Sequence, residues 1–383
     1  MKLDKALSID DLQKLAKRRL PRVVYDFVDG GAEDEHCLER NYAAYRRQYL
    51  FPRYLVDITT RDQSMELFGE TFSSPFGVAP MGIAAMAWPK ADLRLAEAAA
   101  AANIPFVISG SSTATIEDVA KVWPKAWYQL YIPKTNAYTE EILRRADAAG
   151  LKVLVVTVDV PIHSKRERNI RSGFVRPYTP TLPVMFEALK HPAWVFDYLR
   201  TGLPYQENWI PFGEPGWTSR QLMSFYAKEV PALQTWQTLD YLRKLWPGKL
   251  VVKGVLHPED AVKAANAGAD GIIVSNHGGR QQDRAPTPID AFDAINKAVG
   301  DRLTLMIDSG IKRGSDVVAA LCHGAKFTFV GRGMMYGVAA GGFKGAKKAM
   351  DILRSEVDIA LGQIGCPNAS KLGPQFLYHG PGA

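Results

Sequence analysis

A short segment, residues 275–280, combines a base with an anion-binding group. Its sequence is Ser-Asn-His-Gly-Gly-Arg, so two glycines separate the imidazole of His277 from the guanidinium of Arg280. An imidazole can take up a proton near neutral pH, and a guanidinium can bind a carboxylate through two parallel hydrogen bonds. Asp159 is a candidate carboxylate that would orient the imidazole. For any single histidine an ordinary hydrogen-bonded role is more common, so proton transfer by His277 is a hypothesis.

A second pair of segments has the composition of a phosphate site. Residues 308–314 read Asp-Ser-Gly-Ile-Lys-Arg-Gly, and residues 331–333 read Gly-Arg-Gly. Backbone N–H groups of glycine turns and a guanidinium fork suit a phosphate dianion. The alternative is two ordinary glycine turns with solvated basic side chains, but their location after the last two predicted strands favours phosphate. The third glycine of a Rossmann fingerprint is missing here, which disfavours nicotinamide binding.

Alternating helical and strand patterns supply the elements that must position these groups. Helical stretches repeatedly end in Ala or Gly and run into short β-branched strands, with Gly150, Gly268 and Gly324 at three such junctions. Continuous apolar strands that alternate with helices are typical of a parallel sheet, and eight of them match an α/β fold of the closed (β/α)8 TIM-barrel type. The predicted strands are 76–79, 106–109, 127–130, 153–158, 250–253, 271–275, 303–307 and 327–330.

Chemically active residue types lie at or just after the end of nearly every predicted strand. In a TIM barrel the carboxyl ends of the strands form the active-site face, so these residues are expected to meet there. They are Pro80, Met81, Gly82, Ser109, Gln129, Tyr131, Thr157, Asp159, Lys253, Asn276, His277, Arg280, Asp308, Ser309, Gly310, Gly331 and Arg332.

Two parts of the chain do not follow the regular alternation of strands and helices. We expect a single domain, 1–383, with an N-terminal helical cap over residues 1–54 and an insertion, or lid, over residues 160–236. The insertion is rich in aromatic residues, and the part around residues 180–215 interleaves them with basic side chains. This mixture suits an anionic membrane surface, although a soluble lid over the site carries nearly equal weight.

Composition excludes several classes of protein. The 383 residues are 47% hydrophobic and 23% charged, which excludes a disordered or coiled-coil chain. The net charge of +7 favours anionic partners and does not indicate nucleic acid. Three distant cysteines encode neither a disulfide framework nor a thiolate zinc site, which suits a reducing cytoplasm. The charged N-terminus argues against export.

The motifs together resemble the FMN-dependent L-2-hydroxy acid oxidases and dehydrogenases, a family that includes glycolate oxidase and lactate dehydrogenase. The matches are Tyr25-Asp26-Phe27 with residues 30–33, QLY at 129–131, VTVD at 156–159, residues 165–167, LVVKG at 250–254, SNHGGRQ at 275–281 and residues 308–314. They run in order along nearly the whole chain, and the tail at 361–377 is most similar to the (S)-mandelate dehydrogenase branch. The resemblance implies FMN-dependent oxidation of a mandelate-like or lactate-like (S)-2-hydroxy acid to its 2-oxo acid.

The resemblance also implies a role for each matching residue. Arg280, with Tyr25 and Arg166, would hold the substrate carboxylate, and Tyr131 would meet the α-hydroxyl. His277, supported by Asp159, would be the base. Ser111, small where glycolate-type oxidases carry a bulky aromatic residue, and His163 would border the side group and leave room for a large one. The residues that would bind FMN are Pro80, Met81, Gly82, Ser109, Gln129, Thr157, Lys253, Ser275, Asp308, Ser309, Gly310, Lys312, Arg313, Gly331 and Arg332.

Several alternatives stay open in the sequence. The electron acceptor would be a quinone or another carrier, whereas an oxidase that uses O2 and forms H2O2 is the alternative. A more remote alternative is a non-flavin, phosphate-binding aldolase or isomerase with Lys253 as a Schiff-base amine. Lys312 stands where the family commonly has Arg, and Gln282 where Leu is common. We expect a cytoplasmic enzyme, peripheral on the inner face of the cytoplasmic membrane if the insertion binds lipid, and a homotetramer by resemblance.

Overall fold

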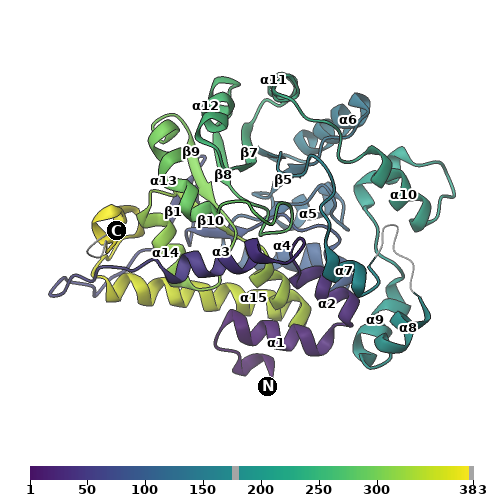
Figure 1. Ribbon diagram of the computed structural model, residues 1–383, viewed down its shortest axis with the longest axis horizontal. Coiled ribbons are helices and arrows are strands. Elements are labelled where there is room, and N and C mark those ends of the chain that lie inside the picture. The colour runs from purple at the N-terminus through teal and green to yellow at the C-terminus, as the bar shows by residue number, and fades with distance from the viewer. Residues whose placement is uncertain (175–180, 379–383) are drawn as a thin grey trace.

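A barrel of eight parallel strands forms the centre of the computed structural model, which describes residues 1–174 and 181–378 (Figure 1). The strands are β3 (Phe76–Val78), β4 (Val107–Ile108), β5 (Trp127–Leu130), β6 (Val153–Thr157), β7 (Lys249–Val255), β8 (Gly271–Val274), β9 (Thr304–Ile307) and β10 (Phe327–Val330). They pair in the order β3-β10-β9-β8-β7-β6-β5-β4, and a parallel bridge between Val78 and Phe106 joins the two edges. The predicted α/β TIM barrel is confirmed.

The strands are buried on both faces, which explains their continuous apolar sequences. All five residues of β6, VLVVT, are buried because one face packs into the barrel interior and the other against helices. Strand β7 has an irregular register between Lys253 and Val255 where it pairs with β8. Gly254 in this bulge has a φ of +108°, and a Cβ there would lie 2.5 Å from the Cβ of Asp159. Glycine therefore lets Asp159 lie directly beside the bulge.

Helices cover the outside of the barrel. They are α4 (Ala91–Ala102), α5 (Ile116–Val122), α6 (Asn136–Ala148), α11 (Trp236–Leu245), α12 (Pro258–Asn266), α13 (Pro288–Val299), α14 (Gly314–Cys322) and α15 (Arg332–Gln363). Threonine side chains cap several of them; the hydroxyls of Thr115 and Thr287 accept hydrogen bonds from the backbone N–H groups of Asp118 and Asp290. Helix α15 begins directly after β10, so its first residues lie at the active-site end of the barrel.

The N-terminal residues form helices that pack across α15 and the barrel mouth (Figure 1). They are α1 (Ile9–Arg19), α2 (Arg22–Asp29) and α3 (His36–Arg46), after the short 3-10 helix η1 (Leu3–Lys5). A hairpin of β1 (Met65–Leu67) and β2 (Glu70–Phe72) follows, turning through Phe68 and Gly69, both with positive φ. The sequence analysis did not predict this hairpin, since three-residue strands carry almost no periodic signal.

The insertion folds into short helices: α7 (Glu167–Arg171), α8 (Leu182–Ala188), α9 (Pro192–Thr201), η3 (Glu207–Phe212) and α10 (Ser219–Glu229). Trp209 on η3 packs edge-to-face on Tyr226 of α10, with ring centroids 5.0 Å apart, so part of the aromatic surface is buried as expected. Helices α8 and α9 lie at the margin of the molecule (Figure 1). Within residues 1–174 and 181–378, no helix combines the length and the hydropathy that crossing a bilayer requires.

The remaining 3-10 helices are η2 (Ala84–Met86), η4 (Ala369–Lys371) and η5 (Pro374–Phe376). Of these, η2 matters for the site because it follows the loop after β3.

Candidate active site

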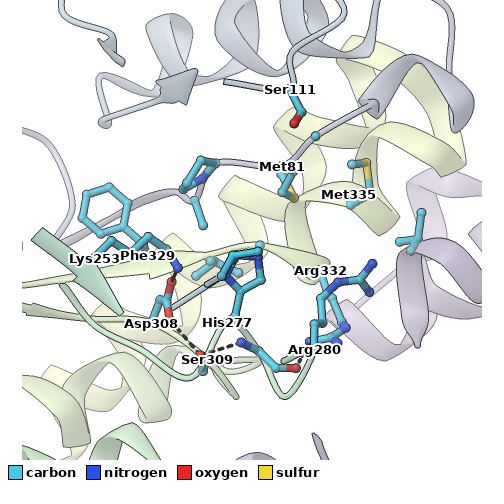
Figure 2. A pocket seen from close by; sticks show the side chains of 18 of the residues that line it. Met81, Ser111, Lys253, His277, Arg280, Asp308, Ser309, Phe329, Arg332 and Met335 are labelled. Atoms are coloured by element: carbon cyan, nitrogen blue, oxygen red, sulfur yellow. Dashed lines mark hydrogen bonds and ion pairs between the residues drawn. The ribbon is translucent and has the colours of Figure 1, made fainter. Parts of the chain in front are cut away.

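A cavity of about 200 Å3 lies at the carboxyl ends of the barrel strands. Most of the predicted site residues meet there, as Figure 2 shows for ten of the lining residues. The predicted residues that line the cavity are Pro80, Met81, Gly82, Ser111, Tyr131, His163, Arg166, Lys253, His277, Arg280, Asp308, Ser309, Gly310, Lys312, Gly331 and Arg332. Behind them lie the buried side chains of Ser109, Gln129, Thr157, Asp159 and Ser275.

His277 is held in one orientation by its backbone and by Asp159. Its φ is +59°, a conformation rare outside glycine, and its N–H donates to Ser275 Oγ at 3.0 Å. Its Nδ1 lies 2.7 Å from Asp159 Oδ1. We assign the ring hydrogen to Nδ1, because an ionised carboxylate can only accept. Nε2 therefore carries the lone pair, 3.5 Å from the hydroxyl of Tyr131.

The electrostatics of this pair favour a neutral imidazole beside an ionised carboxylate. Burial lowers the pKa of His277 below its ordinary value, against the opposing effect of Asp159. Burial alone would raise the pKa of Asp159, but its interactions with His277 and with the Lys253 ammonium outweigh burial and lower that pKa. At neutral pH the arrangement thus supplies a general base that is already deprotonated.

Lys253 is a buried cation between two carboxylates. Its Nζ lies 3.2 Å from Asp308 Oδ2 and 3.9 Å from Asp159 Oδ2, and it donates to Ser275 Oγ at 2.9 Å. Burial would lower the pKa of Lys253, but Asp308 and Asp159 outweigh that effect and raise it. A charged ammonium therefore faces the cavity, where it can stabilise a developing anion.

The carboxyl end of α2 fixes two guanidinium groups. Arg280 donates to the carbonyl oxygens of Gly30 at 2.7 Å and Phe27 at 2.8 Å. Arg332 donates to Asp29 O at 3.1 Å, Gly30 O at 2.8 Å and Gly278 O at 2.8 Å. The last carbonyls of a helix have no partner within the helix and carry partial negative charge, so they suit cations. Helix α2 thus positions both cations at the cavity.

Arg166 and the loop after β8 hold each other. The Nε of Arg166 donates to Ser164 Oγ at 3.1 Å and to the carbonyl of Arg280 at 3.2 Å, and its terminal NH2 donates to Gln281 Oε1 at 3.1 Å. A third guanidinium is thereby fixed next to Arg280.

Comparison with known proteins identifies the family to which this site belongs. A model of the family described as FMN-dependent dehydrogenase matches residues 16–379. The chain belongs to the FMN-dependent dehydrogenase family. It is 38% identical to (S)-mandelate dehydrogenase of Pseudomonas putida, over 97% of this chain and 94% of that one. A peroxisomal (S)-2-hydroxyacid oxidase of Arabidopsis thaliana is 35% identical, over 95% and 94%.

The fold also matches that of a crystal structure of a related protein. The monotopic membrane protein (S)-mandelate dehydrogenase superposes with a TM-score of 0.93 at 37% identity, covering 98% of this chain and 99% of that one. The prediction of an FMN-dependent 2-hydroxy acid dehydrogenase or oxidase is therefore confirmed at the level of the family. The protein is an oxidoreductase, and FMN is its cofactor.

The residues around the cavity fit FMN. Gln129 Oε1 accepts from Ser109 Oγ and Gly110 N, whereas Gln129 Nε2 and Thr157 Oγ1 are buried and have no hydrogen-bond partner among the described residues. Buried donors of this kind call for a polar ligand. Together with the Lys253 ammonium they suit the polar edge of a flavin ring.

The other end of the cavity fits a phosphate. Ser309 and Gly310 have φ values of +73° and +89°, and a Cβ on Gly310 would lie 2.6 Å from the carbonyl oxygen of Asn41. This turn, with Gly331-Arg332 at the beginning of α15, offers N–H groups and a guanidinium. Lys312 adds a cation, although its Nζ also lies 2.9 Å from Asp10 Oδ1.

The structure places two of the predicted site residues, Tyr25 and Arg313, away from the cavity. Tyr25 does not line the cavity: its hydroxyl accepts a hydrogen bond from Gln13 Nε2 at 3.2 Å, between α1 and α2. Phe27 lines the cavity instead. Two residues further along a helix, a side chain points about 200° away, so Tyr25 and Phe27 face nearly opposite sides of α2. Arg313 also lies outside the cavity, paired at 3.2 Å with Glu356 Oε1, while the neighbouring Lys312 lines it.

Several lining residues were missed by the sequence analysis. Phe27 supports Arg280, whose guanidinium carbon lies 5.5 Å from the centre of its ring, and it stacks on Phe174 with ring centroids 4.6 Å apart. Tyr226, from α10 in the insertion, is hydrogen-bonded to Ser111 Oγ. The phase of α2 could have indicated Phe27, but no sequence signal places a residue 115 positions away against Ser111.

Proposed function

We propose that this enzyme oxidises a bulky, aromatic (S)-2-hydroxy acid to the corresponding 2-oxo acid and passes the electrons to a quinone. The observation that carries the proposal is the composition of the cavity. A base, a buried ammonium and three guanidinium groups meet at its polar side, whereas Phe27, Ser111, Tyr226 and other uncharged residues line much of the rest.

The chain's own residues account for binding and proton transfer. Arg280 and Arg166, both fixed by hydrogen bonds, would hold the substrate carboxylate. FMN, when bound, would supply the two-electron acceptor that the oxidation requires. His277 Nε2 accepts a proton from the substrate, whether the proton leaves the α-carbon or the hydroxyl first. Tyr131, 3.5 Å from Nε2, is placed to bond the hydroxyl. The Lys253 ammonium would hold the polar edge of the cofactor and would balance negative charge there.

The handedness of the substrate follows from the fixed positions of these groups. One carboxylate clamp and one base can address a single face of the α-carbon, so the (R)-enantiomer would present its α-hydrogen away from the base. The (S)-specific relatives from Pseudomonas putida and Arabidopsis thaliana support the (S) assignment.

Exposed apolar side chains on α8 and α9 support membrane contact and hence a quinone acceptor. Phe186 is 68% and Leu199 is 77% exposed, and Leu182, Met185, Leu189 and Phe196 are exposed as well. Such a cluster on a soluble surface marks an interaction site. With a net charge of +7 it suits peripheral binding to anionic lipid. The monotopic membrane protein (S)-mandelate dehydrogenase supports the same interpretation. The enzyme would then lie on the inner face of the cytoplasmic membrane.

A substrate and acceptor panel tests the proposal. The holoenzyme should have a higher kcat/KM for (S)-mandelate or (S)-3-phenyllactate than for glycolate, and Ser111→Trp should reverse that order because indole fills the space beside Tyr226. Quinone reduction should exceed H2O2 formation under air. Glycolate as the best substrate would contradict the pocket assignment, and stoichiometric H2O2 would establish the O2-using oxidase instead.

A further inference from the structure

A second, smaller cavity, of about 30 Å3, lies beside the active-site cavity on the side of the insertion. We call it the side chamber; its walls come from η2, residues 203–206 and α10, with Met86, Leu203 and Met223 among the side chains that line it and not the active-site cavity. Met86 and Met223 are buried, and most of the chamber's lining is apolar. Space of this size holds a few non-hydrogen atoms.

The side chamber adjoins the active-site cavity through shared side chains. Ile83, His163, Tyr226 and Val230 line both. Tyr226 is bonded to Ser111, and Figure 2 shows Ser111 across the cavity from Arg280 and Asp308. A substrate whose carboxylate is held at Arg280 would therefore direct its side group towards Ser111, Tyr226 and the side chamber.

One polar group in the side chamber has an unmet hydrogen-bonding capacity. Gln206 lines the chamber and is only 3% exposed, and its Oε1, closed off from solvent in this conformation, has no hydrogen-bond partner in the described part of the chain. An unpaired buried amide oxygen is costly, so a ligand donor that reached it would gain a hydrogen bond in an apolar setting.

We propose that the side chamber receives the distal part of the substrate's side group and that Gln206 accepts a hydrogen bond from a donor at its far end. The favoured substrate class is then an (S)-2-hydroxy acid with an arylalkyl side group that ends in a hydroxyl, such as (S)-3-(4-hydroxyphenyl)lactate. This inference rests on the proposed function and extends it.

Filling the side chamber tests its role. In the FMN-loaded enzyme, Met223→Phe should lower kcat/KM for (S)-3-phenyllactate about tenfold or more and change that for (S)-2-hydroxybutanoate less than about twofold. Met185→Phe is the matched control, because it makes the same change on the exposed face of α8. If Met223→Phe loses FMN, Ala227→Leu fills the chamber from its exposed end instead. Equal effects on the long and the short substrate would overturn the inference.

A second measurement tests Gln206. The ratio of kcat/KM for (S)-3-(4-hydroxyphenyl)lactate to that for (S)-3-phenyllactate should fall about five- to tenfold in Gln206→Leu, since only the first substrate carries the donor. An unchanged ratio overturns the assignment of Gln206 even though the enzyme still oxidises both acids. Failure to oxidise any 2-hydroxy acid in the wild type would instead overturn the proposed function.

Discussion

His277 is the residue on which proton transfer depends, since its imidazole lines the cavity and is fixed by the carboxylate of Asp159. Replacing it by Gln should lower kcat by roughly 10²–10⁴, the usual contribution of a general base, while FMN stays bound. His323→Gln is the matched control, because His323 also pairs with an aspartate, Asp293, outside the site. Near-normal turnover in His277→Gln would remove it from the mechanism.

The pH profile follows from the direction of the His277 pKa. The base works in its neutral form, and burial lowers its pKa below the ordinary value of 6.5. Activity should therefore hold as the pH falls to 6.5 and decline only below it, as the ring takes up a proton. Measuring kcat/KM against pH for the free enzyme tests this; an acid limb above pH 6.5 would show that another group, or a charged imidazole, controls the reaction.

Arg280 should not tolerate replacement by lysine. Two of its N–H groups are used by the carbonyls of Phe27 and Gly30, which a single ammonium cannot satisfy while also holding a carboxylate. Hydrogen bonds to charged groups contribute about 1.5–3 kcal/mol, so Arg280→Lys should lower kcat/KM roughly 10- to 100-fold. Steady-state kinetics measure this, with Arg302→Lys as an exposed control. An unchanged kcat/KM in Arg280→Lys would indicate that Arg166, and not Arg280, binds the substrate carboxylate.

Sequence reasoning located the groups at strand ends better than those on α2 and in the turn before α14. His277, Lys253 and Asp308 lie at or just after the carboxyl ends of strands that must converge, so topology alone brings them together. Tyr25 and Arg313 were assigned from motif resemblance, and a motif does not state which of two neighbouring side chains faces the cavity. The phase of α2 and the turn before α14 decide that, through packing that the sequence does not display.

Helices α8 and α9 form the surface through which we expect the enzyme to contact a membrane. Replacing the exposed Phe186 and Phe196 by Glu should abolish co-sedimentation with anionic vesicles at low salt, since it removes apolar contact and adds repulsion. Turnover of soluble substrate with a dye acceptor should not change. Ile359→Glu, a similar exposed apolar position on α15, is the control. If the double variant still binds the vesicles, α8 and α9 are not the membrane-binding surface, and the soluble-lid interpretation is favoured.

Element prediction succeeded where burial imposes a strong pattern. All eight barrel strands lie where continuous β-branched sequences predicted them, although β4 is reduced to two residues. The insertion was predicted only as a long aromatic-rich segment, because its helices are short and packed by tertiary contacts such as that between Trp209 and Tyr226. The side chamber depends on those contacts and could not have been read from the sequence.

For the whole molecule, the barrel explains how residues from positions 80 to 332 share one cavity, and the N-terminal helices explain why the cations there are fixed. The homotetramer expected from the family resemblance stays a prediction, which light scattering on the purified holoenzyme would check.

Anaerobic reduction of the bound flavin tests the central claim most directly. The purified enzyme, loaded with FMN and mixed with (S)-mandelate in the absence of oxygen and other acceptors, should lose its visible flavin absorbance at a rate that saturates with substrate. (R)-Mandelate should leave the absorbance unchanged on the same timescale, because the clamp and His277 address one face of the α-carbon. An enzyme that binds FMN but whose flavin is reduced by no (S)-2-hydroxy acid would contradict the account.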